Sequence, residues 1–263
     1  MTALEIAGLQ TDIVWESPRQ TFHLVRPMIE RATASGARLV VLPEMFATGF
    51  SMDAETVAPH GETVRDFLAE TAKRSGVWLA GGYAEAGSGG SKPKNACSIF
   101  APDGEEALRY HKIHPFSLAG EHLHFAGGTE LPSVTIEGVR VTPLICYDLR
   151  FPEPFRIAAE RTDLFLVVAN WPDARIDAWS TLLKARAIEN QAFVLGVNRV
   201  GEGDGLAYSG RSALVDPSGY EVATAAHQPA VLRASVAPAA VRAHRERFSF
   251  LADRRPDVYG AMP

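Results

Sequence analysis

Cysteine is scarce in this 263-residue sequence, which contains only Cys97 and Cys146 and no Cys-x-x-Cys pair. Two isolated cysteines do not form the disulfide framework that stabilises small secreted proteins. They are typical of a reducing compartment, where a thiol remains free. We therefore expect a cytoplasmic protein whose stability comes from its hydrophobic core.

Long apolar runs and clusters of basic residues are also missing. No stretch reaches the ~18 apolar residues that a membrane-spanning helix needs, so we expect no membrane association. The sequence has 26 Lys and Arg against 31 Asp and Glu, a net charge of −5. With no basic stripe, nucleic acid is not an expected partner. The glycine-rich motifs that bind phosphates are absent, which argues against a nucleotide cofactor.

Hydrophobic residues make up 46% of the sequence, which is enough for a sizeable core. Strand-like runs alternate with amphipathic helical segments, and each half of the chain contains a series of strands. This pattern predicts two similar halves in a layered α/β architecture. We expect a single domain over residues 1–263, with 248–263 as a C-terminal strap. The clearest strands lie at 4–11, 37–43, 77–85, 163–170 and 193–200, and the clearest helices at 21–36, 61–76 and 174–192.

Three of the apolar runs end on residues that carry chemistry. The run ARLVVLP ends at Glu44, EEALRYH ends at Lys112, and VRVTPLI ends at Cys146. In open α/β sheets, functional groups gather at the carboxyl ends of strands. We therefore expect the carboxylate, the amine and the thiol to lie close together.

Such a group suits nucleophilic catalysis. Cys146 is the candidate nucleophile and Glu44 the candidate general base, while a neighbouring ammonium lowers the pKa of a thiol. Lys112 and the backbone N–H of Tyr147 would stabilise the negative charge on a carbonyl oxygen under attack. A second interpretation stays open on the residues alone: a salt bridge between Glu44 and Lys112 beside an inert, buried thiol.

Several segments of the sequence resemble one family. LPEMFATGF, HKIHPF with GEHLHFAGG, and LICYDLRFP are similar to the three signature regions of the nitrilase superfamily of carbon–nitrogen hydrolases. VVANWP and KARAIENQAFVLGVNRVG resemble later segments of the same superfamily. The likeness extends from about residue 4 to residue 247, which is nearly the whole chain.

The resemblance implies a fold and a set of site residues. The fold would be a four-layer α–β–β–α sandwich, and the catalytic triad would be Glu44, Lys112 and Cys146. Glu121 matches the second glutamate of the family, which supports the lysine and helps to place the substrate. The family uses no metal or other cofactor. Because its members are commonly oligomers, the resemblance also implies a homodimer.

Within the superfamily, the motifs most resemble those of ω-amidases. The implied reaction is hydrolysis of the terminal amide of 2-oxo acid monoamides, such as 2-oxoglutaramate and 2-oxosuccinamate, to a 2-oxo dicarboxylate and ammonia. The alternatives are another amidase, carbamoylase or nitrilase of the superfamily with a different small substrate. A catalytically silent oligomeric scaffold is the remaining alternative, although all three triad residues are present.

Other residues are candidates for substrate contacts. Trp171 follows a strand, so it either walls the acyl pocket or packs in the core. His122 is a candidate for the mouth of the pocket. Arg150 either binds a substrate carboxylate or forms an internal ion pair that holds the turn after Cys146. Arg175 and Arg199 are further candidate cations that the sequence does not rank. The histidine spacings HKIH and HLH do not predict a metal site.

Overall fold

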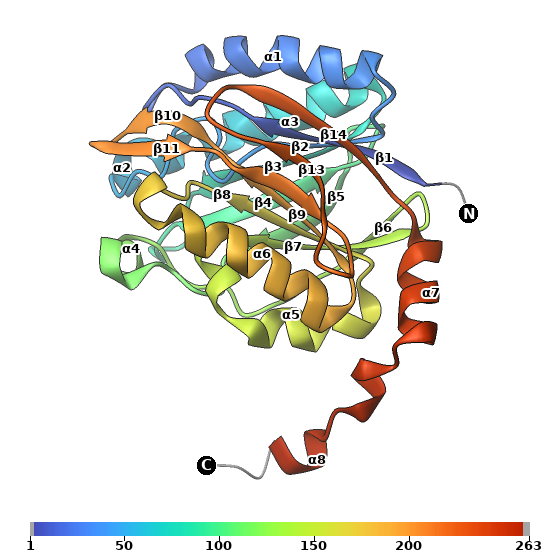
Figure 1. Ribbon diagram of the computed structural model, residues 1–263. Helices are drawn as coiled ribbons and strands as arrows, with labels where there is room; N and C mark the ends of the chain where they lie inside the picture. Colours follow the sequence, from blue (N-terminus) through green and yellow to red (C-terminus); the bar gives the residue numbers. More distant parts are fainter. Residues whose placement is uncertain (1–2, 260–263) are drawn as a thin grey trace.

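Two six-stranded sheets lie at the centre of the computed structural model, which describes residues 3–259 (Figure 1). In the first sheet, the last strand of the chain pairs antiparallel with the first, while β1, β2 and β3 are parallel. The order is β14 (Ala230–Val236), β1 (Leu4–Gln10), β2 (Leu39–Val41), β3 (Trp78–Glu85), β4 (Lys94–Phe100) and β5 (Glu106–His111).

The second sheet repeats this plan in the other half of the chain. Its central strands β7, β8 and β9 are parallel, and the strands at both edges are antiparallel to their neighbours. The order is β13 (Glu221–Ala225), β12 (Ser212–Val215), β9 (Phe193–Asn198), β8 (Leu164–Ala169), β7 (Val139–Ile145) and β6 (Val134–Ile136). A separate hairpin joins β10 (Val200–Gly203) to β11 (Leu206–Ser209).

Helices cover the outer face of each sheet and complete four layers (Figure 1). Helix α3 (Gly61–Ser75) is capped at its end by Gly76, whose φ of +63° is left-handed. No helix within residues 3–259 is both long and apolar enough to cross a membrane. The first sheet carries α1 (Pro18–Ala34) and α3 (Gly61–Ser75), and the second carries α5 (Pro152–Ala158) and α6 (Ile176–Asn190); α2 (Ala54–Val57) and α4 (Glu121–His124) are single turns.

The core explains why the central strands read as continuous apolar runs. In β1, Leu4 and Ile6 face the second sheet, whereas Ala7 and Leu9 face helix α1. Because both faces of such a strand are buried, alternation between apolar and polar residues disappears. The predicted four-layer α–β–β–α sandwich is therefore confirmed.

The strand directions bring the carboxyl ends of strands from both sheets to the same region. β4 runs antiparallel to both β3 and β5, so β5 ends at the same edge as β2. In the second sheet, β7, β8 and β9 end together. The residues that follow these strands are thereby brought to one region, as the rule for carboxyl ends of strands predicts.

The C-terminal segment leaves the sandwich through α7 (Pro238–Arg247) and reaches α8 (Pro256–Tyr259) (Figure 1). It contacts its own chain, because Gln191 donates to the carbonyl of Phe248 at 2.6 Å and Arg254 pairs with Glu160. The predicted strap at 248–263 is described only to residue 259, and its last four residues lie outside the described part.

A glycine beside Glu44 yields a prediction about packing. A Cβ on Gly82 would lie 2.6 Å from the Cα of Glu44, whereas one on Gly81 would lie 3.1 Å from side-chain carbons of Leu68 and Phe46. Backbone cannot move aside as side chains do, so Gly82→Ala should lower the free energy of unfolding by about 1–3 kcal/mol. Urea denaturation measures this change. The matched variant Gly81→Ala should cost less, and equal costs would contradict the prediction.

Candidate active site

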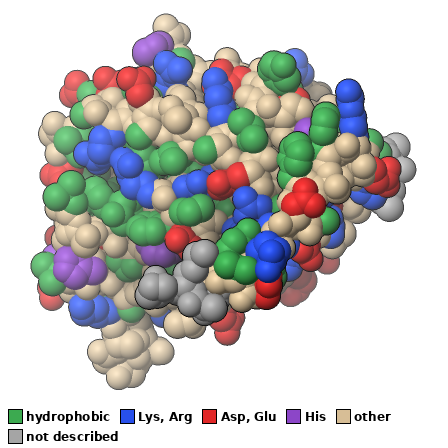
Figure 2. Space-filling model, turned by 60° about the horizontal axis from the view of Figure 1, so that its bottom comes forward, with side chains coloured by type: hydrophobic (Ala, Val, Ile, Leu, Met, Phe, Trp, Pro, Cys, Tyr) green, Lys and Arg blue, Asp and Glu red, His purple; other side chains and the backbone are tan. Residues whose placement is uncertain are grey.

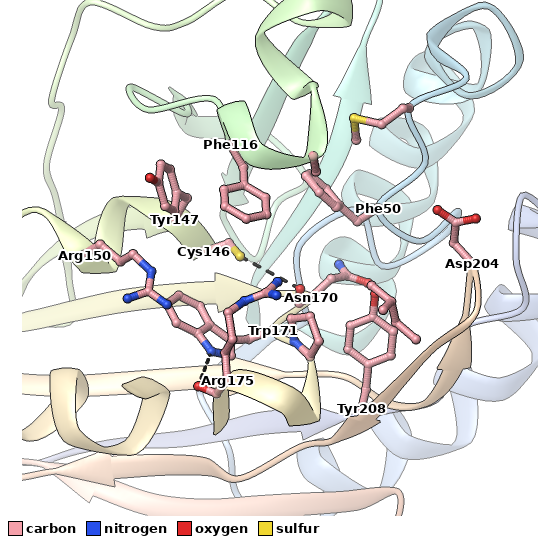
Figure 3. A pocket seen from close by; sticks show the side chains of 14 residues that line it. Phe50, Phe116, Cys146, Tyr147, Arg150, Asn170, Trp171, Arg175, Asp204 and Tyr208 are labelled. Atoms are coloured by element: carbon pink, nitrogen blue, oxygen red, sulfur yellow. Dashed lines mark hydrogen bonds between the residues drawn. The ribbon is translucent and has the colours of Figure 1, made fainter. Parts of the chain in front are cut away.

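Cys146 stands at a sharp turn. Strand β7 ends at Ile145, and Cys146 opens a 3₁₀ turn over Cys146–Arg150 with a left-handed φ of +45°. This conformation is costly for a residue with a side chain and is typical of functional sites. Here it directs the half-buried thiol into a cavity of 240 Å³ (Figure 3). The Sγ lies 4.0 Å from the carbonyl oxygen of Asn170.

The buried carboxylate of Asp148 holds this turn in place. One of its oxygens accepts hydrogen bonds from the backbone N–H of Ile145 at 3.0 Å and from the hydroxyl of Tyr110 at 2.7 Å. The other accepts from the backbone N–H of His114 at 3.0 Å. Asp148 thus connects the turn at Cys146 with the chain that follows strand β5.

Three of the predicted residues form a buried charge cluster. The ammonium of Lys112 donates to Glu44 Oε1 at 2.9 Å and to Glu121 Oε2 at 2.8 Å. The side chains of Lys112, Glu44 and Glu121 have at most 1% of their surface exposed. The amide of Asn95 bridges the two carboxylates, since its Nδ2 lies 2.8 Å from Glu44 Oε1 and 2.9 Å from Glu121 Oε1.

Backbone groups satisfy the rest of this cluster. Glu44 Oε2 accepts from the backbone N–H of Asn170 at 2.8 Å, and the Asn170 side chain donates to the Glu44 carbonyl at 2.5 Å. Glu121 accepts from the backbone N–H of Phe116 at 2.5 Å. Buried charges are tolerated only with such partners, and these contacts fix Glu44 between the two sheets.

The cluster keeps Lys112 charged and the thiol protonated. Burial alone would lower the pKa of Lys112, but the charges of Glu121 and Glu44 raise it above its ordinary value. Burial, together with the charge of Glu44, raises the pKa of Cys146 well above its ordinary value, although Lys112 acts in the opposite direction. The ammonium of Lys112 does lower the thiol pKa, as expected, but burial and the charge of Glu44 outweigh it, so the net shift is upward.

The second thiol behaves as the sequence predicts for a core residue. Cys97 is completely buried on β4 within the core between the two sheets. Burial raises the pKa of its thiol to about 12. Of the two cysteines, only Cys146 therefore reaches a cavity.

Three of the remaining predicted residues lie around this cavity. Tyr147, Arg150 and Trp171 line it, and Trp171 is also packed against Trp179 with ring centroids 5.5 Å apart. His122 is exposed on the single-turn helix α4 and is not among the residues that line the cavity, so its place at the pocket mouth stays a prediction. Its neighbour Glu121 takes the inward position, because successive residues on a helical turn point in different directions.

The three candidate cations, Arg150, Arg175 and Arg199, lie in different surroundings. Arg199 is fully buried and donates to Asp12 at 3.0 Å and to the carbonyl of Glu202 at 2.8 Å, so it does not line the cavity. Arg150 and Arg175 do line it. Among residues 3–259, Arg150 has no ion pair, so the predicted pair that would hold the turn is not found.

Four residues of the site were not predicted from the sequence. Phe50 and Phe116 line the cavity, and the ring centroid of Phe50 lies 4.8 Å from the ammonium of Lys112. Asn170 could have been predicted, since it directly follows strand β8 in the same way that Lys112 and Cys146 directly follow β5 and β7. Asn95 carried none, because it lies at the start of an antiparallel strand.

No group of three His, Cys, Asp or Glu side chains suited to a metal ion occurs within the described part of the chain. The histidines near the site contact single acids instead. His111 pairs with Glu85, and the ring of His114 lies 2.8 Å from Asp148.

A half-buried thiol next to a carboxylate and an ammonium defines a site for nucleophilic attack on an electrophilic carbon. The chain belongs to the carbon–nitrogen hydrolase family, whose model matches residues 5–246.

Individual relatives match over nearly their full length. The omega-amidase YafV of Escherichia coli (strain K12) is 41% identical over 94% of this chain and 95% of its own. The 2-oxoglutaramate amidase of Bacillus subtilis (strain 168) is 33% identical over 97% of this chain and 98% of its own. The structure of XC1258 from Xanthomonas campestris, a CN-hydrolase superfamily protein with an arsenic adduct in its active site, has a TM-score of 0.90. It is 36% identical and covers 97% of this chain and 98% of its own.

The electrostatics of the cluster predict how Cys146 titrates. Because its pKa is raised, the thiol should stay protonated at every pH below the ordinary value of 9.0. Ultraviolet titration of the wild type minus Cys146→Ala measures the thiolate directly. We expect no Cys146-dependent thiolate at neutral pH, and its appearance there would contradict the prediction. Cys97→Ala should leave the same titration unchanged.

Proposed function

We propose that this enzyme is an ω-amidase, which hydrolyses the terminal amide of 2-oxo acid monoamides such as 2-oxoglutaramate and 2-oxosuccinamate. The observation that supports this proposal most directly is the thiol of Cys146, which lies in a cavity beside the cluster of Glu44, Lys112 and Glu121. The names of the Escherichia coli and Bacillus subtilis relatives support the substrate class.

The first half of the proposed reaction forms a thioester. Cys146 transfers its proton to Glu44 as its sulfur attacks the amide carbon, because the thiol is protonated at rest. The ammonium of Lys112 and the N–H of Tyr147 stabilise the oxyanion. The C–N bond then breaks, and the leaving nitrogen takes the proton from Glu44 to depart as ammonia.

The second half hydrolyses the thioester. Glu44 now accepts a proton from water, whose oxygen attacks the thioester carbon. The C–S bond breaks, the proton returns to the sulfur, and the 2-oxo dicarboxylate leaves. Glu121 acts through Lys112: with Asn95 it holds the ammonium in one position through both steps.

We also propose that two copies associate, in the cytoplasm, through the outer face of the second sheet. Helices α5 and α6 and the C-terminal segment carry large apolar side chains that are exposed there: Ile157 is 69% exposed, Ile188 49% and Phe250 59%. Figure 2 shows hydrophobic side chains gathered on the side of the molecule that carries this segment. Exposed apolar patches are typical of association surfaces.

A substrate panel tests the proposed activity. Ammonia release from 2-oxoglutaramate and 2-oxosuccinamate should exceed release from a simple aliphatic amide and a nitrile. Cys146→Ala should abolish it, since the thiol forms the covalent bond. Cys97→Ala is the matched control and should retain the wild-type rate.

The panel also separates the alternatives. Turnover of only the nitrile or the simple amide would keep the thiol chemistry and reject the 2-oxo acid substrates. Wild-type ammonia release no higher than that of Cys146→Ala on every compound would favour a silent scaffold.

The association proposal has its own test. Light scattering should give twice the mass of one chain for the wild type, and Ile157→Glu should shift it to the mass of one chain, because a buried unpaired charge is costly. Leu24→Glu is the matched control, since Leu24 is 45% exposed on α1, a helix of the opposite layer. A wild type with the mass of one chain would contradict the proposal.

A further inference from the structure

We propose that Arg150 and Arg175 form a clamp for the carboxylate at the far end of the substrate, and so select anionic amides. This inference rests on the proposed function and names the residues that determine its specificity. Both side chains line the cavity that contains the thiol of Cys146 (Figure 3).

Neither guanidinium group has a partner among the residues that the structure describes. Within residues 3–259, neither side chain makes an ion pair or a hydrogen bond. Yet both are half-buried, so each has lost part of its hydration. A half-buried guanidinium presents several N–H donors in a planar fork that matches a carboxylate.

Aromatic rings orient the two guanidiniums in advance. The Cζ of Arg150 lies 4.9 Å from the centroid of a Trp171 ring, and that of Arg175 lies 5.4 Å from the Phe116 ring. The Nε1 of Trp171 also donates to the carbonyl of Arg175 at 2.8 Å, which fixes the backbone there. Stacking occupies one face of each guanidinium and leaves the N–H edges for a ligand.

The charge of the site explains why an anionic substrate needs these arginines. Glu44 and Glu121 against Lys112 leave one negative charge in excess, buried close to Cys146. A carboxylate entering the cavity would be repelled by that excess unless cations lie nearby. The protein as a whole, with a net charge of −5, offers no general attraction for anions.

The position of Asp204 fixes the direction in which the substrate lies. It is the single acidic side chain among the described residues that line the cavity. Figure 3 shows it on the opposite side of the view from Arg150, with Arg175 between them. A substrate carboxylate is therefore repelled from the Asp204 side and attracted to the arginine side, with its amide carbon left at Cys146.

Arg150→Gln and Arg175→Gln test the clamp. The measured quantity is the ratio of kcat/KM for 2-oxoglutaramate to kcat/KM for butyramide, which has no carboxylate. The ratio should fall at least about 30-fold in each variant, because a charged hydrogen-bonded partner is lost. Arg150→Lys and Arg175→Lys, which keep the charge without the planar fork, should lose less. Arg19→Gln, at an exposed position of α1, should leave the ratio unchanged. Equal losses on both amides would overturn the clamp.

A binding assay separates failure of the clamp from failure of the proposed activity. 2-Oxoglutarate, the product, should slow the labelling of Cys146 by iodoacetamide in the wild type. In Arg150→Gln and Arg175→Gln, the concentration that gives half protection should rise at least about tenfold. Unchanged protection in both variants would overturn the clamp even if 2-oxoglutaramate is hydrolysed. If it is not hydrolysed, arginine-dependent protection would still support the clamp while the ω-amidase proposal fails.

Discussion

An ammonium group with 1% of its surface exposed stays charged only where carboxylates replace the water that it has lost. In this protein the ammonium of Lys112 has two such partners, Glu44 and Glu121, and Asn95 bridges them. Asn95 lies on β4 and Lys112 directly follows β5, both in the first sheet. Asn170 follows β8 in the second sheet, and its backbone N–H donates to Glu44. The cluster therefore fixes the proposed general base where the two sheets meet, and removal of Lys112 would leave two buried carboxylates without a counter-charge.

The thiol is positioned by a second set of contacts. Its left-handed backbone follows from the turn after β7, and Asp148 stabilises the turn through the N–H of Ile145 and the hydroxyl of Tyr110. Tyr110 lies on β5, two residues before Lys112, so the turn and the cluster share one strand. A rigid separation between sulfur and carboxylate matters here, because the raised pKa of Cys146 requires the proton to move during attack.

The sequence allowed some of this to be predicted and concealed the rest. Residues directly after strands, such as Glu44 and Cys146, were readable because strand ends are visible in a hydrophobic pattern. Asn95 was not, since its place depends on how an antiparallel strand pairs. The β10–β11 hairpin carried a turn signal at Asp204–Gly205 that went unused. Glu121 is buried and its neighbour His122 is exposed, because sequence proximity does not fix the direction of a side chain.

The environments of the three candidate arginines could not be predicted from the sequence. Arg150, Arg175 and Arg199 are equivalent as residue types, and only the fold shows that Arg199 is occupied by Asp12 while the other two face the cavity. The thiol, the base and the ammonium act on the amide group alone, so they cannot distinguish one acyl chain from another. Selection among amides therefore depends on the cavity wall, which among residues 3–259 carries two arginines without an ion pair and one acid, Asp204.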